Sequence, residues 1–161
     1  MKTRILYTVM ALLLAVPSFA QKTSGHGHND ARHKEMLEFK LKFLADEIDL
    51  RDDQKKQFNE IYTQMENERR AAFRKIRNAE RTIKSKKDAS EEDYEKATNE
   101  IAAAREEMAQ IEKKYDEKLA AVLTKKQMFK LKDAEKKFQD TMRECRDKKK
   151  SEKARKGGQK Q

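Results

Sequence analysis

The residues best suited to chemistry in this sequence are three histidines near its N-terminus. His26, His28 and His33 are the only histidines in the chain, and Asp30 stands among them. Imidazole nitrogens and carboxylate oxygens are ligands for Zn²⁺ and Cu²⁺. The cluster therefore predicts a weak metal site that assembles on binding. The alternative interpretation is that this segment is only a polar leader to the first helix.

The chain offers little other reactive chemistry. Cys145 is its only cysteine, so no disulfide can form within one chain. We interpret Cys145 as a small apolar residue of the last helix, and the alternative is a disulfide between two copies in an oxidising compartment. The sequence contains no glycine-rich phosphate loop, nucleophile triad or metalloprotease motif. We therefore expect a binding protein that is not an enzyme and needs no cofactor beyond the weak metal.

Residues 1–20 have the three parts of a cleavable signal peptide. Two basic residues precede the uncharged apolar run of residues 5–16, and Ser18-Phe19-Ala20 supplies small residues before cleavage at Gln21. The alternative is a membrane anchor, but this run is shorter than the roughly 20 residues that a bilayer requires. We expect an exported protein that works in the periplasm, where nucleic acid is not a partner.

The composition after the signal peptide is typical of long helices or coiled coils. Ala, Glu, Lys, Leu and Arg make up 77 of the 141 residues that follow it. No proline and no strand pattern occurs in this part, and its four glycines are confined to the terminal segments. We therefore predict an all-α fold. The predicted organisation is a signal peptide (1–20), a flexible histidine-containing leader (21–33), a helical domain (34–147) and a disordered basic tail (148–161).

Apolar residues that recur every three or four positions predict four helices, beginning near residues 30, 52, 91 and 125. The two middle helices carry heptad stripes and are joined by a short polar turn, so we expect a long antiparallel hairpin. Narrow stripes favour a rod or a curved sheet of helices, with the second apolar edge buried against another copy. The two stripes are Phe58, Tyr62, Met65, Arg69, Ala72, Ile76, Ala79 and Ile83, and Tyr94, Ala97, Ile101, Ala104, Met108, Ile111, Tyr115, Leu119 and Val122.

Two helix starts share the pattern Leu-x-x-x-Gln. Leu50 and Gln54 open the second predicted helix, and Leu123, Thr124 and Gln127 open the fourth. The leucine should pack back on the core, the threonine should cap the helix, and the glutamine should reach back to the N–H of the cap residue. The pattern therefore predicts a structural role, with each cap contributing about 1 kcal/mol to stability.

This arrangement resembles the Spy/CpxP family of exported stress proteins, which carry paired LTxxQ motifs. The second copy matches that motif in full, whereas Arg51 replaces the threonine in the first, so we expect Asp52 to cap there. The resemblance covers about residues 34–145. It implies an antiparallel homodimer shaped like a shallow cradle and an ATP-independent periplasmic chaperone. Other relatives dampen envelope-stress sensor kinases or bind zinc.

Basic residues are concentrated in two segments. Residues 69–87 contain nine basic residues and one acid. They form either a surface for acidic or unfolded clients or one side of interhelical pairing with the acids of residues 88–100. Residues 125–161 contain 15 basic and 6 acidic residues. This second surplus is either a solvated tail or an attraction to acidic clients or an anionic membrane surface.

The combined features predict an exported chaperone of the holdase type, which binds unfolded envelope proteins through a basic and partly apolar helical surface. Arg69 interrupts an apolar stripe and Phe73 lies off it, so one of them should face a partner. The predicted client contacts are Arg69, Arg70, Phe73, Arg74 and Arg77. The alternative function is a periplasmic stress or heavy-metal sensor that uses the histidine cluster and acts on a sensor protein. A third is a structural spacer of the envelope.

Calorimetric titration with Zn²⁺ and Cu²⁺ tests the histidine cluster. If His26, His28 and His33 supply the ligands, replacing all three with alanine abolishes the binding heat, because too few nitrogen donors remain. Cys145→Ser serves as the control and should bind as the unaltered protein does. Binding that survives the triple substitution rules this cluster out as the site.

Overall fold

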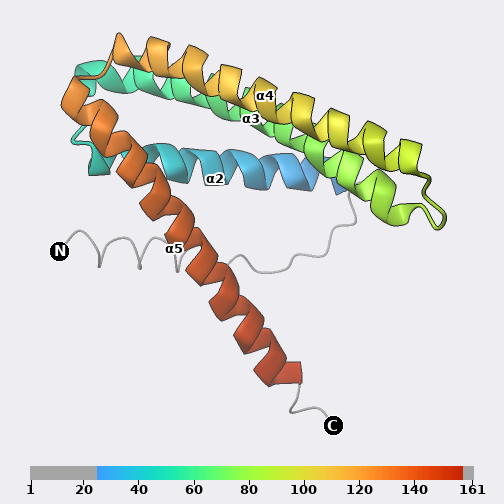
Figure 1. Cartoon of the computed structure of the whole chain (residues 1–161). Helices are drawn as coiled ribbons and strands as arrows, with labels where there is room; N and C mark the ends of the chain where they lie inside the picture. The colour runs from blue at the N-terminus through green and yellow to red at the C-terminus, as the bar shows by residue number, and fades with distance from the viewer. Residues whose placement is uncertain (1–24, 158–161) are drawn as a thin grey trace. The chain divides into compact units, whose positions relative to one another are not determined.

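The computed structural model describes residues 25–157, which are helical apart from short connections (Figure 1). Its four helices are α2 (Gly25–Glu47), α3 (Asp52–Ser85), α4 (Glu91–Ala120) and α5 (Lys125–Gly157). The described part contains no strand, so the predicted all-α class is confirmed. Within it, no helix has both the length and the apolar character needed to cross a membrane. The predicted signal peptide lies outside the described residues.

Helices α3 and α4 lie side by side and form the predicted antiparallel hairpin (Figure 1). Their heptad stripes supply its core, and near the turn this core consists largely of alanines, whose small side chains allow close packing. Lys75 Nζ donates to Glu107 at 2.6 Å, and Tyr115 Oη donates to Glu68 at 2.7 Å. These contacts across the two helices specify the hairpin register. The buried residues of the two stripes are Phe58, Tyr62, Met65, Ala72, Ile76 and Ala79, and Ala97, Ala104, Ile111, Tyr115 and Leu119.

The hairpin turn ends in the capping box that the sequence predicted. Ser90 is the N-cap of α4, and its hydroxyl accepts the Asp93 N–H at 3.3 Å. The Asp93 carboxylate in turn accepts the Ser90 N–H at 3.0 Å and a hydrogen bond from the Lys86 ammonium. Together, the Lys86 bond and the two Ser90 bonds lower the pKa of Asp93 from its ordinary 3.8 to about 2.

This lowered pKa predicts how the turn responds to acid. A carboxylate that is more acidic in the folded state stabilises the fold above its ordinary pKa, and the stabilisation is lost as the pH falls toward 2. Asp93→Asn should therefore lower the urea midpoint at neutral pH but not near pH 2. Asp88→Asn, an exposed change in the same turn, is the control. An equal effect of Asp93→Asn at both pH values contradicts this account.

Residues 36–161 form one unit by their contacts, distinct from residues 1–35, and the packing described here belongs to it. Within this unit α5 packs against the C-terminal half of α2. The Phe138 ring lies 5.8 Å from that of Phe39 and 5.5 Å from that of Phe43. Lys137 Nζ also donates to Glu47 at 2.8 Å. An aromatic cluster with a charged rim therefore holds α5 on α2.

Two boundaries differ from those predicted. Helix α2 begins at Gly25, earlier than the predicted start near residue 30, so it includes part of the segment predicted to be a flexible leader. Helix α5 continues to Gly157, although disorder was expected from residue 148. Lysine, arginine, glutamate and alanine dominate residues 148–156, and all four are good helix formers. The first strong helix breakers in this segment are Gly157 and Gly158.

Candidate functional site

The two Leu-x-x-x-Gln motifs meet at the open end of the hairpin. Gln54 Nε2 donates to Gln127 Oε1 at 3.1 Å, and Gln127 Nε2 donates to Gln54 Oε1 at 3.0 Å. Both side chains are buried, with 4% and 7% of their surface exposed. This reciprocal contact, which we call the glutamine pair, joins the start of α3 to the start of α5 across 73 residues of sequence.

Each glutamine also binds the backbone at both helix junctions. Its Oε1 accepts the N–H of the residue three positions earlier, at 3.2 Å for Gln54 and 3.0 Å for Gln127. Gln54 Nε2 donates to the Val122 carbonyl at 2.7 Å, and Gln127 Nε2 donates to the Asp49 carbonyl at 3.4 Å. Every polar atom of the two amides thus has a partner, which makes their burial tolerable.

The threonine of the second motif and the leucines of both motifs behave as predicted. Thr124 precedes the first residue of α5, and its hydroxyl accepts the Gln127 N–H at 3.2 Å. Leu50 and Leu123 precede their helices and are buried, at 8% and 5% exposed. The leucines therefore anchor the helix entries on the core.

The predicted capping role of Asp52 is wrong. Helix α3 begins at Asp52, so Arg51 is the N-cap residue. The Arg51 guanidinium has no acceptor for the helix N–H groups, and it pairs with Asp53 at 3.0 Å instead. Asp52 lies on the surface and accepts a hydrogen bond from Lys55. Only the glutamine half of the capping box is therefore present at this entry.

The glutamine pair predicts strong energetic coupling between the two motifs. Gln127→Ala should lower the free energy of unfolding by about 2–3 kcal/mol, because it leaves Gln54 buried with missing partners. The double variant Gln54→Leu with Gln127→Leu should cost less than the sum of the single changes. Urea denaturation measures all of these values, and exposed Gln57→Ala is the matched control, expected to change stability by less than about 0.5 kcal/mol. Additive effects of the two leucine substitutions argue against the pair.

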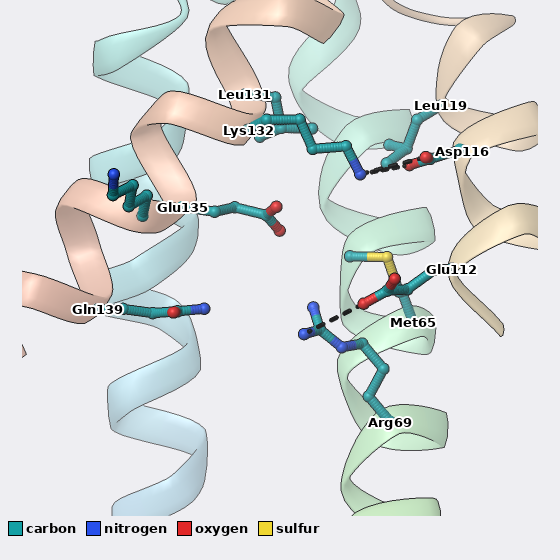
Figure 2. Close-up of a pocket in the computed structure, with 10 residues that line it drawn as sticks. Met65, Arg69, Glu112, Asp116, Leu119, Leu131, Lys132, Glu135 and Gln139 are labelled. Atoms are coloured by element: carbon teal, nitrogen blue, oxygen red, sulfur yellow. Dashed lines mark hydrogen bonds and ion pairs between the residues drawn. The ribbon is translucent and has the colours of Figure 1, made fainter. Parts of the chain in front are cut away.

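A pocket of about 270 Å³ lies where α5 approaches the hairpin (Figure 2). Arg69, Glu135 and Gln139 extend into it, and Met65 lines it from the hairpin side. Glu135 also accepts a hydrogen bond from the Tyr62 hydroxyl at 2.5 Å. Burial, and then the nearby carboxylates, raise the pKa of Tyr62 far above its ordinary value, so its hydroxyl remains a donor.

Arg69 is held inside this polar network. Its guanidinium lies 3.3 Å from a Glu66 oxygen and 3.7 Å from a Glu112 oxygen, the second contact being drawn in Figure 2. Lys40 on α2 also pairs with Glu66, at 3.1 Å. The interruption of the apolar stripe at position 69 therefore has an internal explanation, since Arg69 links α3 to α4 and shares an acid with α2.

Phe73, Arg74 and Arg77 differ from Arg69, because they lie on an exposed side of α3. Phe73 is 50% exposed, and both arginines are exposed. Arg81 continues this side, since positions 74, 77 and 81 follow helical spacing. Within the described part of the chain, these three arginines form no ion pair. The neighbouring Arg70 is half-buried.

Helix α4 adds a further cation to this side of the hairpin. Arg105 is exposed and lies two helical turns before Glu112, which pairs with Arg69 across the hairpin. It therefore lies on the side of α4 from which Glu112 reaches Arg69 on α3. We call Phe73, Arg74, Arg77, Arg81 and Arg105 the arginine face. Arg81 and Arg105 were missed from the sequence, although the hairpin register would have placed them there.

The two interpretations of the basic run apply to different residues. Arg69, Lys75 and Lys86 pair with acids of α4, as interhelical pairing predicts. Of the acids in residues 88–100 that were expected as partners, only Asp93 forms such a pair, with Lys86. Arg69 and Lys75 pair instead with Glu112 and Glu107, which lie further along α4. The α3 arginines of the arginine face are among the cations that this pairing with α4 leaves over.

The histidine cluster stays a prediction. His33 is half-buried, whereas the side chains of His26 and His28 lie outside the described ones. Among the described residues, no group of three or more His, Cys, Asp or Glu side chains is arranged to hold a metal ion. Cys145 lies half-buried on α5 with a free thiol.

The fold and the paired motifs define a class of helical-hairpin protein in which two glutamines tie the hairpin to a following helix. Residues 20–131 match the family model described as Domain of unknown function (DUF4890), and the chain belongs to that family. The matched segment includes both glutamine motifs and the arginine face. No curated protein and no solved structure matches the chain. The Spy/CpxP resemblance therefore stays a prediction.

Proposed function

We propose that this protein is an exported, ATP-independent chaperone that holds unfolded envelope proteins on its arginine face. The observation that carries the proposal is an exposed aromatic ring, Phe73, set among arginines that form no ion pair within the described part of the chain. Unfolded chains present apolar side chains and backbone carbonyls together with acidic groups. A surface that combines a ring with guanidinium donors can contact all three.

The strength of such contacts suits a chaperone without a nucleotide site. Each exposed charge contact contributes about 0.2–1 kcal/mol and is weakened by salt. A client held by several of them binds reversibly, and a different part of the client can replace the bound one. Release then follows from weak binding and requires no ATP.

The hairpin provides a firm support for this face. Ala72, Ile76 and Ala79 lie buried behind the exposed arginines, and Lys75 pairs with Glu107 on the flank. The arginines consequently keep helical spacing, while their long side chains can adapt to different clients. The export signal and the Spy/CpxP resemblance favour the same role. We also propose the homodimer implied by that resemblance, which mass determination in solution tests directly.

Light scattering of a chemically denatured client, at stoichiometric protein and low salt, tests the proposal. The unaltered protein should suppress aggregation. The variant R74Q/R77Q/R81Q/R105Q should need at least about tenfold more protein for the same effect, because four contacts are lost. Phe73→Ala should weaken suppression by a smaller factor.

The matched control is R143Q/R146Q/K148Q/K150Q, which removes the same number of charges from exposed positions of α5. It should suppress aggregation as the unaltered protein does. Circular dichroism confirms that both variants remain helical. An equal loss of suppression in the two variants would show that only net charge matters. If the unaltered protein does not suppress aggregation, the proposal is wrong.

A further inference from the structure

Helix α5 continues well beyond the core of the fold. Among the α5 residues whose burial is described, Phe138 is the last buried one, Met142 and Cys145 are half-buried, and the helix then runs to Gly157. The hydrogen bonds and ion pairs of the described residues from 143 onward, such as Arg143 with Asp140, stay within α5. We call residues 143–157 the α5 extension, and at about 1.5 Å per residue it is roughly 22 Å long.

The α5 extension carries a charge surplus that solubility alone does not require. It contains eight basic and three acidic residues, a net charge of +5. By contrast, residues 21–124, which include the equally exposed hairpin, contain 22 basic and 23 acidic residues. Other long exposed helices of this chain thus carry almost no net charge, so exposure alone does not account for the surplus on the α5 extension.

The described cations of the extension lie along the helix in an ordered way. Arg143, Arg146 and Lys150 are spaced three and four residues apart, which places them on one side of α5. Lys148 is exposed as well. The extension thus presents three cations on one side over about two helical turns, and Asp147 shares that side, so the side keeps a net positive charge.

We propose that the α5 extension docks on the surface of an anionic phospholipid bilayer. A folded protein partner normally requires apolar or aromatic contacts at the centre of its interface. The extension has only Cys145 and Ala154 as apolar residues, so it can form no such centre. A row of cations without an anchor instead matches a broad layer of anionic headgroups, which attracts basic segments peripherally and within a Debye length.

This docking is separate from client binding, and it shares with the proposed function only the expectation of export. Helix α5 would hold the protein near the membrane, while the arginine face lies on the hairpin. Because no apolar side chain inserts, the attachment is reversible and salt-sensitive. A bound protein would then be positioned where newly exported chains emerge.

Vesicle co-sedimentation of the processed protein recovered from the periplasm tests this inference. The protein should bind phosphatidylcholine vesicles that contain phosphatidylglycerol, release in high salt, and not bind vesicles of phosphatidylcholine alone. R143Q/R146Q/K148Q/K150Q should lower the partition coefficient by more than about tenfold, since each cation near an anionic surface contributes substantially. R74Q/R77Q/R81Q/R105Q, with the same loss of charge, should change it by less than about twofold.

Several outcomes would overturn the inference. Equal binding to both vesicle types, or equal losses in the two variants, would leave no specific role for the extension. Polyglutamate is the competitor in a further arm. If it releases the protein from the vesicles at a carboxylate concentration below that of the anionic lipid, the extension prefers an acidic protein partner. The light-scattering assay separates failure of membrane docking from failure of the proposed function. In that assay R143Q/R146Q/K148Q/K150Q should still suppress aggregation, whether or not it binds vesicles.

Discussion

The glutamine pair is the contact on which the rest of this fold depends. Gln54 and Gln127 open helices that are far apart in sequence, and their amides saturate one another and the backbone of both junctions. The pair therefore sets where α3 begins, where α5 begins, and how the two lie against each other. Because a buried amide without partners is costly, neither helix entry can shift without disturbing the other.

The hairpin register divides the cations of α3 into two roles. Cations that face α4 are matched by acids, and Arg69 is drawn inward by Glu66 and Glu112. The cations of the arginine face lack such partners within the described residues. The same basic run thus contains residues that stabilise the fold and residues available for binding. The physical distinction is whether the helix rotation brings an acid of α4 within reach.

Two exposed cationic surfaces result, and their chemistry differs. The arginine face includes Phe73 and is supported by the alanine-rich core of the hairpin. The α5 extension has almost no apolar residue and follows Phe138, the last buried residue of the helix among those whose burial is described. A surface with a ring suits peptide chains, whereas a row of cations alone suits a layer of anionic headgroups. This difference is the basis for assigning them different partners.

Much of the fold could be read from the sequence, because helix signals are local. The heptad stripes, the capping box at Ser90 and the polar turn predicted the hairpin closely. The C-terminal end of α5 lies beyond the predicted one, because residues 148–156 carry almost no apolar residue to mark a helix face although their residue types favour helix. Local patterns also showed two Leu-x-x-x-Gln motifs, each as a separate cap.

Three features could be found only in the folded chain: the contact between the two motifs, the internal ion pairs of Arg69, and the place of Arg105 beside the hairpin arginines. Each of these depends on which residues of distant helices come together, and that follows from the hairpin register and from the packing of α5. The helices and most of their caps can be predicted from the amino-acid order, since they depend on neighbours in the chain. The contacts that join those helices could not be predicted in this way, because they form between side chains that are far apart in sequence and meet only when the chain is folded.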